Sequence, residues 1–349
     1  MTRVDRLRQS GISIWLDTLS RELLESGRFE RLIRDYGVTG ATSNPTIFER
    51  AISGSDRYDD DLGRAASPRL AFFDAALADV SAAAKLLRPS WEDSAGRDGY
   101  VSFQTTPDLA YDPHGMVDQA LALWRRLALP NVLIKVPATS AGVTAVEELT
   151  VLGVNVNVTL LFSVDRYQEV IEAYLRGLER RLARGLPLSG ISSVASFFVS
   201  RIDAKADPQL PEALRGRIAV ANALHAYDVQ ARLFQGERWE RLEAAGARPQ
   251  RPLWASTGTK DPCYSDVLYV QELATPGAVN TMPEATLKAF ADHGEVRAPS
   301  PDFEEVLAQA PLDLDAITAQ LEREGVEAFL ASYDRLLAEL ESRVAAVAA

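Results

Sequence analysis

The chain alternates short apolar runs with longer segments of helical period, and this alternation constrains its fold more than any other feature. Segments such as 19–36 and 164–183 place apolar residues at spacings of three and four, which is typical of amphipathic helices. Between the helical segments we expect strands at residues 13–17, 37–44, 100–105, 131–137, 154–162, 192–198, 251–257 and 278–283. Strands that alternate with helices form a parallel sheet with both faces covered.

Roughly eight such strands favour an α/β fold of the closed (β/α)8 TIM-barrel type. The alternative is an open doubly wound sheet, but no G-x-G-x-x-G motif follows the first expected strand. Two connections are long, residues 45–99 and 202–250, and both have helical composition. We therefore expect a single barrel domain over residues 1–349, with extra helices inserted in these connections and added at the C-terminus.

Charge and cysteine content exclude several classes of function. The formal net charge is −12, so nucleic acid is an unfavourable partner and a phosphorylated substrate would need a local basic pocket. The single cysteine cannot form an internal disulfide, and the three histidines are widely separated, so we expect no metal site. No apolar run approaches about 18 residues and no signal peptide is visible, which predicts a cytoplasmic protein without a membrane partner. A homo-oligomer remains open.

Polar residues stand at or near the ends of the expected strands. In a parallel barrel the carboxyl ends of the strands meet at one rim, where catalytic groups collect. Each polar residue alone could be a helix cap, a turn residue or a solvated strand end. For Asp17 taken alone, a cap of the following helix and a functional carboxylate have equal weight. Their convergence favours a site made of Asp17, Asn44, Gln104, Lys135, Ser196 and Ser256.

Lys135 lies inside the apolar run 131–137, which reads as a buried strand. A buried ammonium loses several kcal/mol of solvation, so such a lysine normally has an ion partner or a lowered pKa. One interpretation is a strand-end lysine that reaches solvent or pairs with a carboxylate. The other is a neutral amine that attacks a carbonyl, which its neutral amide and hydroxyl neighbours favour.

The strand expected at 154–162 carries three polar residues of one parity, Asn155, Asn157 and Thr159, and we expect them on one face. Phosphate candidates follow the next two strands. Arg201 comes after the strand at 192–198, with an ion pair to Asp203 as its alternative role. The segment 256–260 lacks P-loop spacing, yet loops near the last strands of barrels often hold phosphate.

Several stretches resemble the transaldolase family, in its longer bacterial form, from about residue 11 to the end of the chain. The motifs are WLDTLSR, GVTGATSNPTIFERAI, LIKVPAT, VNVNVTLLFSVDRY, SVASFFVSRID, LWASTGTKDP and VNTMPEATL. The resemblance implies a class I Schiff-base aldolase on a (β/α)8 barrel. Such an enzyme moves a dihydroxyacetone unit between sugar phosphates without a metal or organic cofactor.

The resemblance also implies roles for individual residues. Lys135 matches the lysine that forms the Schiff base, and Asp17 matches the carboxylate that takes and returns the proton of the C4 hydroxyl. Thr159 matches the threonine that positions the catalytic water. The remaining matches are groups that hold hydroxyls of the three-carbon unit (Asn44, Asn157 and Ser196) and groups at the phosphate site (Arg201 and Ser256).

The sequence departs from the family pattern at two places, Gln104 and Gly258. Gln104 stands in VSFQTTPD where a glutamate is usual, and glutamine can orient a water but cannot accept its proton. Related fructose-6-phosphate aldolases carry glutamine there, but they pair it with a tyrosine where this chain has Phe198. Gly258 replaces an arginine of the shorter transaldolases, which leaves Lys260 as the nearest cation for phosphate.

Three functions therefore compete. The leading one is a transaldolase that uses sedoheptulose 7-phosphate or fructose 6-phosphate as donor and an aldose phosphate as acceptor, in the pentose phosphate pathway. The nearest alternative is a lyase that releases free dihydroxyacetone, or a transferase diverted to an unusual sugar. The third is a sugar-phosphate-binding protein without turnover, which the presence of Lys135 and Asp17 disfavours.

Overall fold

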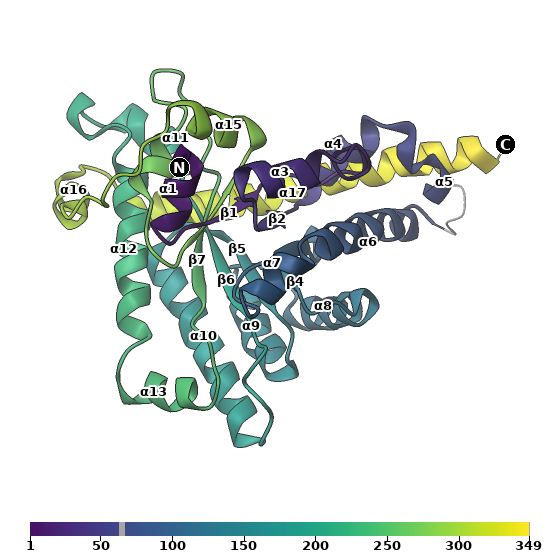
Figure 1. Cartoon of the computed structure of the whole chain (residues 1–349), viewed down its shortest axis with the longest axis horizontal. Helices are drawn as coiled ribbons and strands as arrows, with labels where there is room; N and C mark the ends of the chain where they lie inside the picture. Colours follow the sequence, from purple (N-terminus) through teal and green to yellow (C-terminus); the bar gives the residue numbers. More distant parts are fainter. Residues whose placement is uncertain (63–66, 349) are drawn as a thin grey trace.

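The expected barrel is present in the computed structural model, which describes residues 1–62 and 67–348. Residues 63–66 of the expected connection 45–99, and Ala349 at the end of the expected domain, lie outside the described residues. Eight parallel strands pair in chain order, and the last pairs with the first to close the barrel (Figure 1). The strands are β1 (Ser13–Leu16), β2 (Gly40–Thr42), β3 (Tyr100–Gln104), β4 (Val132–Pro137), β5 (Val156–Leu161), β6 (Ser193–Phe198), β7 (Arg251–Ala255) and β8 (Val279–Met282).

Each expected strand contains one observed strand, and the largest difference is at β2. We expected a strand over residues 37–44, but only three residues pair with the neighbouring strands. The residues on either side lie at the end of one helix and at the start of the next. The N–H of Val38 bonds to the carbonyl of Leu32 in the preceding helix, and Asn44 caps the following one. Gly40 is needed at the start of β2, since a Cβ there would lie 2.4 Å from the Trp15 ring of its paired strand.

Helices surround the barrel. The expected helix 164–183 is observed over those same residues, whereas the segment 19–36 forms two helices because Gly27 adopts a left-handed conformation with φ +69°. Outside the two long connections the helices are α1 (Arg3–Gln9), α2 (Arg21–Glu25), α3 (Arg28–Tyr36), η2 (Pro107–Leu109, a 3-10 helix), α8 (Pro113–Leu127), α9 (Ser140–Leu152), α10 (Val164–Ala183), α14 (Leu268–Glu272) and α15 (Glu284–His293).

Both long connections contain helices, as predicted. The first holds α4 (Pro45–Ser53), η1 (Asp56–Tyr58), α5 (Asp59–Leu62), α6 (Pro68–Leu86) and α7 (Arg88–Asp93). The second holds α11 (Ser200–Ala206), η3 (Asp207–Gln209), η4 (Glu212–Leu214), α12 (Ile218–Leu233) and α13 (Gly236–Ala244). The first insertion packs on the outer face of β3 through Phe48 and Phe103, whose rings are 5.8 Å apart and nearly perpendicular.

The expected C-terminal helices are α16 (Phe303–Gln309) and the long α17 (Leu314–Ala348). Helix α17 runs across the barrel, drawn yellow in Figure 1, and contacts α4, α6, α11 and β5. Gly325 allows this approach, because a Cβ there would lie 2.8 Å from the Leu160 side chain of β5. The end of the chain therefore packs beside the strand that carries Asn157 and Thr159.

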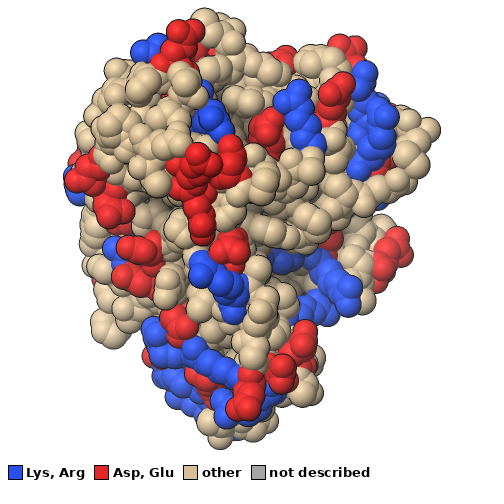
Figure 2. Space-filling view, turned by 90° about the vertical axis from the view of Figure 1, so that its left-hand side faces the viewer, with Lys and Arg blue, Asp and Glu red and all other residues tan. Residues whose placement is uncertain are grey.

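The surface carries both signs of charge. On the face shown in Figure 2, acidic and basic side chains are both present, and the basic ones are densest at the lower end, where acidic ones lie among them. Some of these charges form ion pairs between helices, as where Arg238 of α13 pairs with Glu172 and Glu179 of α10. No helix among the described residues has the length and apolar character needed to cross a membrane.

Candidate active site

Lys135 lies on β4, with Gln104 of β3 and Asn157 of β5 as its paired neighbours. Its side chain is 3% exposed, and its amine donates a hydrogen bond to the carbonyl of Ser43 at 3.4 Å. Burial lowers the pKa of Lys135 to about 8, against the charge of Asp17, which raises it, and with the charge of Arg201, which lowers it further. The strand-end interpretation is wrong, because the amine neither reaches solvent nor lies within an ion-pair distance of a described carboxylate. A buried amine of lowered pKa is suited to attack a carbonyl.

Asp17 follows β1 directly and faces the same interior. It accepts a hydrogen bond from the hydroxyl of Thr42 at 3.0 Å, and that hydroxyl lies 2.8 Å from the hydroxyl of Thr281. It does not cap the next helix, because Ser20 does so. Burial raises the pKa of Asp17, while the charge of Lys135 and the bond from Thr42 lower it. The lysine and the aspartate therefore each favour the ionised form of the other.

Asn157 and Ser196 form one hydrogen-bonded group inside the barrel. Ser196 donates to Asn157 Oδ1 at 2.7 Å, and Asn157 Nδ2 donates to the hydroxyl of Ser102 at 2.9 Å. All three side chains are fully buried. The bonds to Ser102 and Ser196 hold the Asn157 amide in one orientation. The second N–H of this amide is therefore available to a ligand hydroxyl.

Gln104 and Thr159 lie on the two strands that flank Lys135. Gln104 Oε1 and Thr159 Oγ1 are buried, and neither has a hydrogen-bond partner among the described residues. Buried polar atoms normally have a partner, so these two atoms suit a water or a substrate hydroxyl. Next to Thr159 the ladder between β5 and β6 shifts register, and Leu160 adopts φ +57°. Strained backbone of this kind is concentrated at functional sites.

Asn44 and Phe198 lie at the ends of β2 and β6. Asn44 Oδ1 caps α4 by accepting from the N–H of Ile47 at 2.9 Å, so the capping interpretation is correct for this oxygen and leaves the amide N–H groups for other partners. Phe198 is buried, with its ring 5.2 Å from that of Phe162.

Arg201 and Ser256 occupy adjacent loops beyond β6 and β7. The Arg201 guanidinium lies over the Phe198 ring at 5.2 Å, and no hydrogen bond or ion pair joins it to the part of the chain that the structure describes. Its alternative partner Asp203 is engaged elsewhere, with Ala219 and Tyr269. Burial lowers the pKa of Arg201, against the charges of Asp17 and Glu324. A half-buried guanidinium with open donors is suited to an anion.

Ser256 has the left-handed φ of +57°, and its hydroxyl lies 3.0 Å from that of Ser200. Lys260 is exposed on the same loop, and its charge, like that of Arg201, lowers the pKa of Asp17. The structure thus brings the proposed phosphate residues to one side of the barrel mouth and Lys135 to its floor.

Sequence reasoning missed four residues that hold this site. Thr42 and Thr281 orient Asp17, Ser102 orients Asn157, and the carbonyl of Ser43 accepts from Lys135. One signal was available for Ser102. It is two residues before Gln104 on β3, so both side chains lie on the same face of the strand. Asn155, which we expected on the same face as Asn157, does not join the hydrogen-bonded group of that residue. Its side chain instead bonds to backbone groups of Pro130, Val132 and Ser192 and so helps to close the base of the strand.

No set of three or more His, Cys, Asp or Glu side chains in residues 1–62 and 67–348 is arranged to hold a metal ion. The site offers an amine of lowered pKa, a carboxylate, neutral hydrogen-bonding groups and the cation of Arg201. This combination suits covalent capture of a polyhydroxy carbonyl compound that carries an anionic group.

Comparison with known proteins agrees with this chemistry. The model of the family described as transaldolase/fructose-6-phosphate aldolase matches residues 14–340. The chain is 46% identical to the transaldolase of Saccharopolyspora erythraea, over 96% of each protein. It is 47% identical to transaldolase 1 of Streptomyces avermitilis, over 98% of this chain and 91% of the relative. It is also 47% identical to transaldolase 1 of Streptomyces coelicolor, over 96% and 93%.

Proposed function

The chain belongs to the transaldolase/fructose-6-phosphate aldolase family, and from this premise we propose that it is a transaldolase. It transfers a dihydroxyacetone unit from a ketose phosphate, sedoheptulose 7-phosphate or fructose 6-phosphate, to an aldose phosphate. The pathway is the pentose phosphate pathway. The observation that carries the proposal is Lys135, a buried amine of lowered pKa with Asp17 on the same barrel interior.

The first step is imine formation at Lys135. The neutral amine attacks the C2 carbonyl of the ketose, and the carbinolamine loses water to give a protonated imine. The imine nitrogen is an electron sink for the next step, because it accepts the electron pair released when the C3–C4 bond breaks. A lysine with a pKa of about 8 supplies a useful fraction of free amine at neutral pH.

Asp17 is the proton acceptor for that cleavage. Its carboxylate takes the proton of the C4 hydroxyl, the C3–C4 bond breaks, and the aldose phosphate leaves while an enamine stays on Lys135. The acceptor aldehyde then reacts with the enamine, and Asp17 returns the proton to the new hydroxyl. The bond from Thr42 supports this role because it fixes the carboxylate and favours its ionised form.

The neutral polar side chains orient the substrate. Asn44, Asn157 and Ser196 hold hydroxyls of the three-carbon unit, and Phe198 packs against its apolar face. Arg201, Ser256 and Lys260 bind the phosphate at the far end of the chain. The open donors of Arg201 and its place over Phe198 support this assignment.

Gln104 and Thr159 hold the water that is lost and regained at the imine. Their unpartnered buried oxygens support this role. Gln104 is also the observation that favours a second function, a fructose-6-phosphate aldolase-like lyase, since the related aldolases carry glutamine at this position. Phe198 favours the transferase, because the aldolases pair their glutamine with a tyrosine there.

Trapping of the covalent intermediate tests the proposal. Fructose 6-phosphate and borohydride should attach a three-carbon adduct to Lys135, as located by peptide mass spectrometry. Lys135→Met should abolish both adduct and turnover. An adduct on another lysine would overturn the assignment.

Product analysis then separates the transferase from the lyase. With fructose 6-phosphate and an acceptor such as erythrose 4-phosphate, a transferase forms sedoheptulose 7-phosphate and little free dihydroxyacetone. A lyase releases dihydroxyacetone at the same rate with and without the acceptor. We also place the enzyme in the cytoplasm, which fractionation of the source cells would test.

A further inference from the structure

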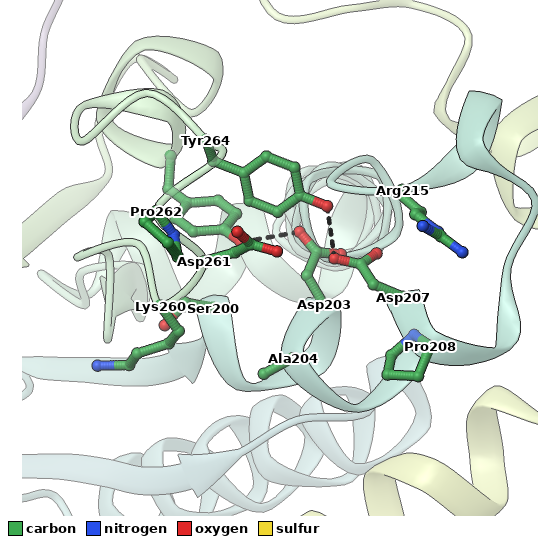
Figure 3. A pocket seen from close by; sticks show the side chains of 11 residues that line it. Ser200, Asp203, Ala204, Asp207, Pro208, Arg215, Lys260, Asp261, Pro262 and Tyr264 are labelled. Carbon is green, nitrogen blue, oxygen red and sulfur yellow. Dashed lines mark hydrogen bonds between the residues drawn. The ribbon is translucent and has the colours of Figure 1, made fainter.

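Two carboxylate–tyrosine pairs lie just behind the proposed phosphate site. The hydroxyl of Tyr269 donates to Asp203 Oδ2 at 2.9 Å, and the hydroxyl of Tyr264 donates to Asp207 Oδ2 at 2.7 Å (Figure 3). Asp203 lies on α11 two residues after Arg201, and Asp207 follows at the end of the same helix. Both tyrosines come from the chain that leaves β7 through Ser256 and Lys260. The pairs therefore connect the two segments that carry the phosphate residues.

The second oxygen of each carboxylate binds a third segment. Asp203 Oδ1 accepts from the N–H of Ala219 at 2.8 Å, and Asp207 Oδ1 accepts from the N–H of Gly216 at 3.0 Å. Each aspartate thus joins a tyrosine of the β7 connection to the backbone at the start of α12. Two such bridges, one turn apart on α11, resist both translation and rotation of the connection.

The connection needs such contacts, because residues 256–267 form neither helix nor strand. Its backbone bonds to the rest of the described molecule lie at its base, where the N–H of Ser200 donates to the carbonyl of Ser256 at 3.1 Å, and its other backbone bonds, such as Tyr264 N–H to the carbonyl of Asp261, are internal. Beyond that point the connection borders a cavity of about 490 Å³, with Lys260 and Arg215 on opposite sides of the carboxylates in Figure 3. Buried Thr257 anchors the start of the connection, because its hydroxyl bonds to Asn280 and to the carbonyl of Thr281 on β8. Lys260 lies beyond this anchor, so its distance to Arg201 depends on the side-chain bridges that follow.

The chemistry of the pairs favours a positional role. Asp203 is 1% exposed, and burial together with the charge of Asp207 raises its pKa to about 7, against the bonds from Ala219 and Tyr269. Burial raises the pKa of Tyr269, which keeps its hydroxyl protonated and able to donate. Well-packed apolar residues often give more stability than buried charges, so such groups are explained better by the geometry that they enforce.

We propose that the Asp203–Tyr269 and Asp207–Tyr264 pairs are positioning residues for phosphate recognition. They hold the connection after β7 against α11 and so set the spacing between Arg201 on one side and Ser256 and Lys260 on the other. The inference rests on the proposed function, in which those three residues bind the substrate phosphate. It adds that the preference for phosphorylated substrates depends on residues that touch no substrate.

Removal of one oxygen from each tyrosine tests this inference. Tyr269→Phe and Tyr264→Phe should raise the half-saturating concentration of fructose 6-phosphate by about fivefold or more, because a bond to a charged group is lost. The half-saturating concentration of unphosphorylated dihydroxyacetone, measured by borohydride trapping at Lys135, should change less than about twofold. Tyr174→Phe is the matched control, since it removes a buried hydroxyl that bonds to the carbonyl of Arg248 before β7. It should alter neither value.

The outcomes separate the inference from the function beneath it. The inference would be overturned if the two tyrosine variants bound both substrates equally less well. It would also be overturned if they bound both as well as the natural chain does. Arg201→Ala is measured in parallel. A selective loss of fructose 6-phosphate binding in Arg201→Ala with none in the tyrosine variants overturns only the inference. An equal loss on both substrates in Arg201→Ala removes the phosphate site and this inference together, while the adduct on Lys135 still reports the imine chemistry. Should Tyr269→Phe fail to fold, the half-buried Tyr264 gives the same test.

Discussion

At the scale of single residues, the burial of Lys135 destabilises the fold but gives its amine the pKa that the reaction needs. A lysine 3% exposed without an ion pair loses solvation that its hydrogen bond to Ser43 replaces only in part. The same desolvation lowers the pKa of the amine to about 8 and makes it a nucleophile near neutral pH. The destabilising feature and the reactive feature are therefore one property.

This pKa predicts the pH dependence of imine formation. Well below pH 8 the free-amine fraction falls about tenfold per pH unit, so the rate of borohydride-trapped adduct should rise about tenfold from pH 6 to pH 7 and level off above about pH 9. An ordinary lysine would give a rate that still rises beyond pH 10. A rise of about tenfold from pH 9 to pH 10 would therefore contradict the lowered pKa. The trapping rate with dihydroxyacetone is the appropriate measurement, because it contains no C–C cleavage step.

A second residue-scale prediction concerns Gln104. An amide oxygen can orient a water but cannot take its proton, so hydrolysis of the imine depends on another base such as Asp17. Gln104→Glu should speed the release of dihydroxyacetone by about tenfold or more and add a titrating group to its pH profile. Transfer to an acceptor aldehyde should change less, because it proceeds through Asp17 while the enamine stays on Lys135.

The control for Gln104→Glu is Thr159→Val, which keeps the shape of the side chain and removes the second oxygen at the water position. Thr159→Val should slow hydrolysis of the imine both in the natural chain and in the Gln104→Glu variant. If Gln104→Glu leaves both the rate and the pH profile unchanged, then Gln104 does not face the water. If the natural chain already releases dihydroxyacetone rapidly, that result favours the lyase function over the transferase function.

At the scale of elements, the position of Lys135 depends on how α9 packs against the end of β4. Gly142 lies in the first turn of α9, and its N–H donates to the Thr139 hydroxyl at 3.0 Å. A Cβ at this position would lie 1.7 Å from the carbonyl oxygen of Pro137, the last residue of β4. Backbone atoms cannot move aside as a side chain can, so helix and strand would have to separate.

Gly142→Ala should therefore lower the free energy of unfolding by about 1–3 kcal/mol or more and slow imine formation at Lys135. Urea unfolding and the trapping assay measure the two effects. Gly54→Ala is the control, because Gly54 ends α4 at φ −88° and a Cβ there would be 3.0 Å from the nearest atom, the carbonyl oxygen of Arg50. Equal stability of the two variants would show that β4 and α9 adjust without cost.

At the scale of the whole molecule, α17 joins the first insertion to the barrel. Near its end, Arg343 donates to the carbonyls of Ile52 and Ser55 at 2.7 and 2.9 Å and pairs with Asp59. Ile52 lies in the last turn of α4, Ser55 follows that helix and Asp59 begins α5. One guanidinium therefore joins the insertion to the C-terminal helix. The contact is far along α17 from Gly325, which meets β5.

Arg343→Ala should lower the free energy of unfolding by about 1–3 kcal/mol, because two backbone carbonyls and a carboxylate lose their donor. Turnover should be unchanged, since no residue of the site contacts this guanidinium. Arg335→Ala on the same helix removes an exposed pair with Glu49 and should have a smaller effect on stability. A large loss of turnover in Arg343→Ala would mean that the insertion controls the site.

The sequence by itself determined the architecture and the positions of the polar strand ends. Strand and helix periods depend on local side-chain patterns, and a parallel barrel then brings all strand ends to one rim, so Lys135, Asp17 and Arg201 could be selected from spacing alone. The helix 164–183 and the helical insertions follow from the same local rules.

Only the tertiary structure decided how each polar group is satisfied. Hydrogen bonds between distant strands, such as Thr42 to Asp17 or Ser102 with Asn157, have no local signature, because the partners are 25 and 55 residues apart. For the same reason sequence reasoning did not find the backbone partners of Asn155 or the bridge from Asp203 to Tyr269. Periodicity predicts which face a side chain takes, whereas its partner depends on which strands the closed barrel brings together.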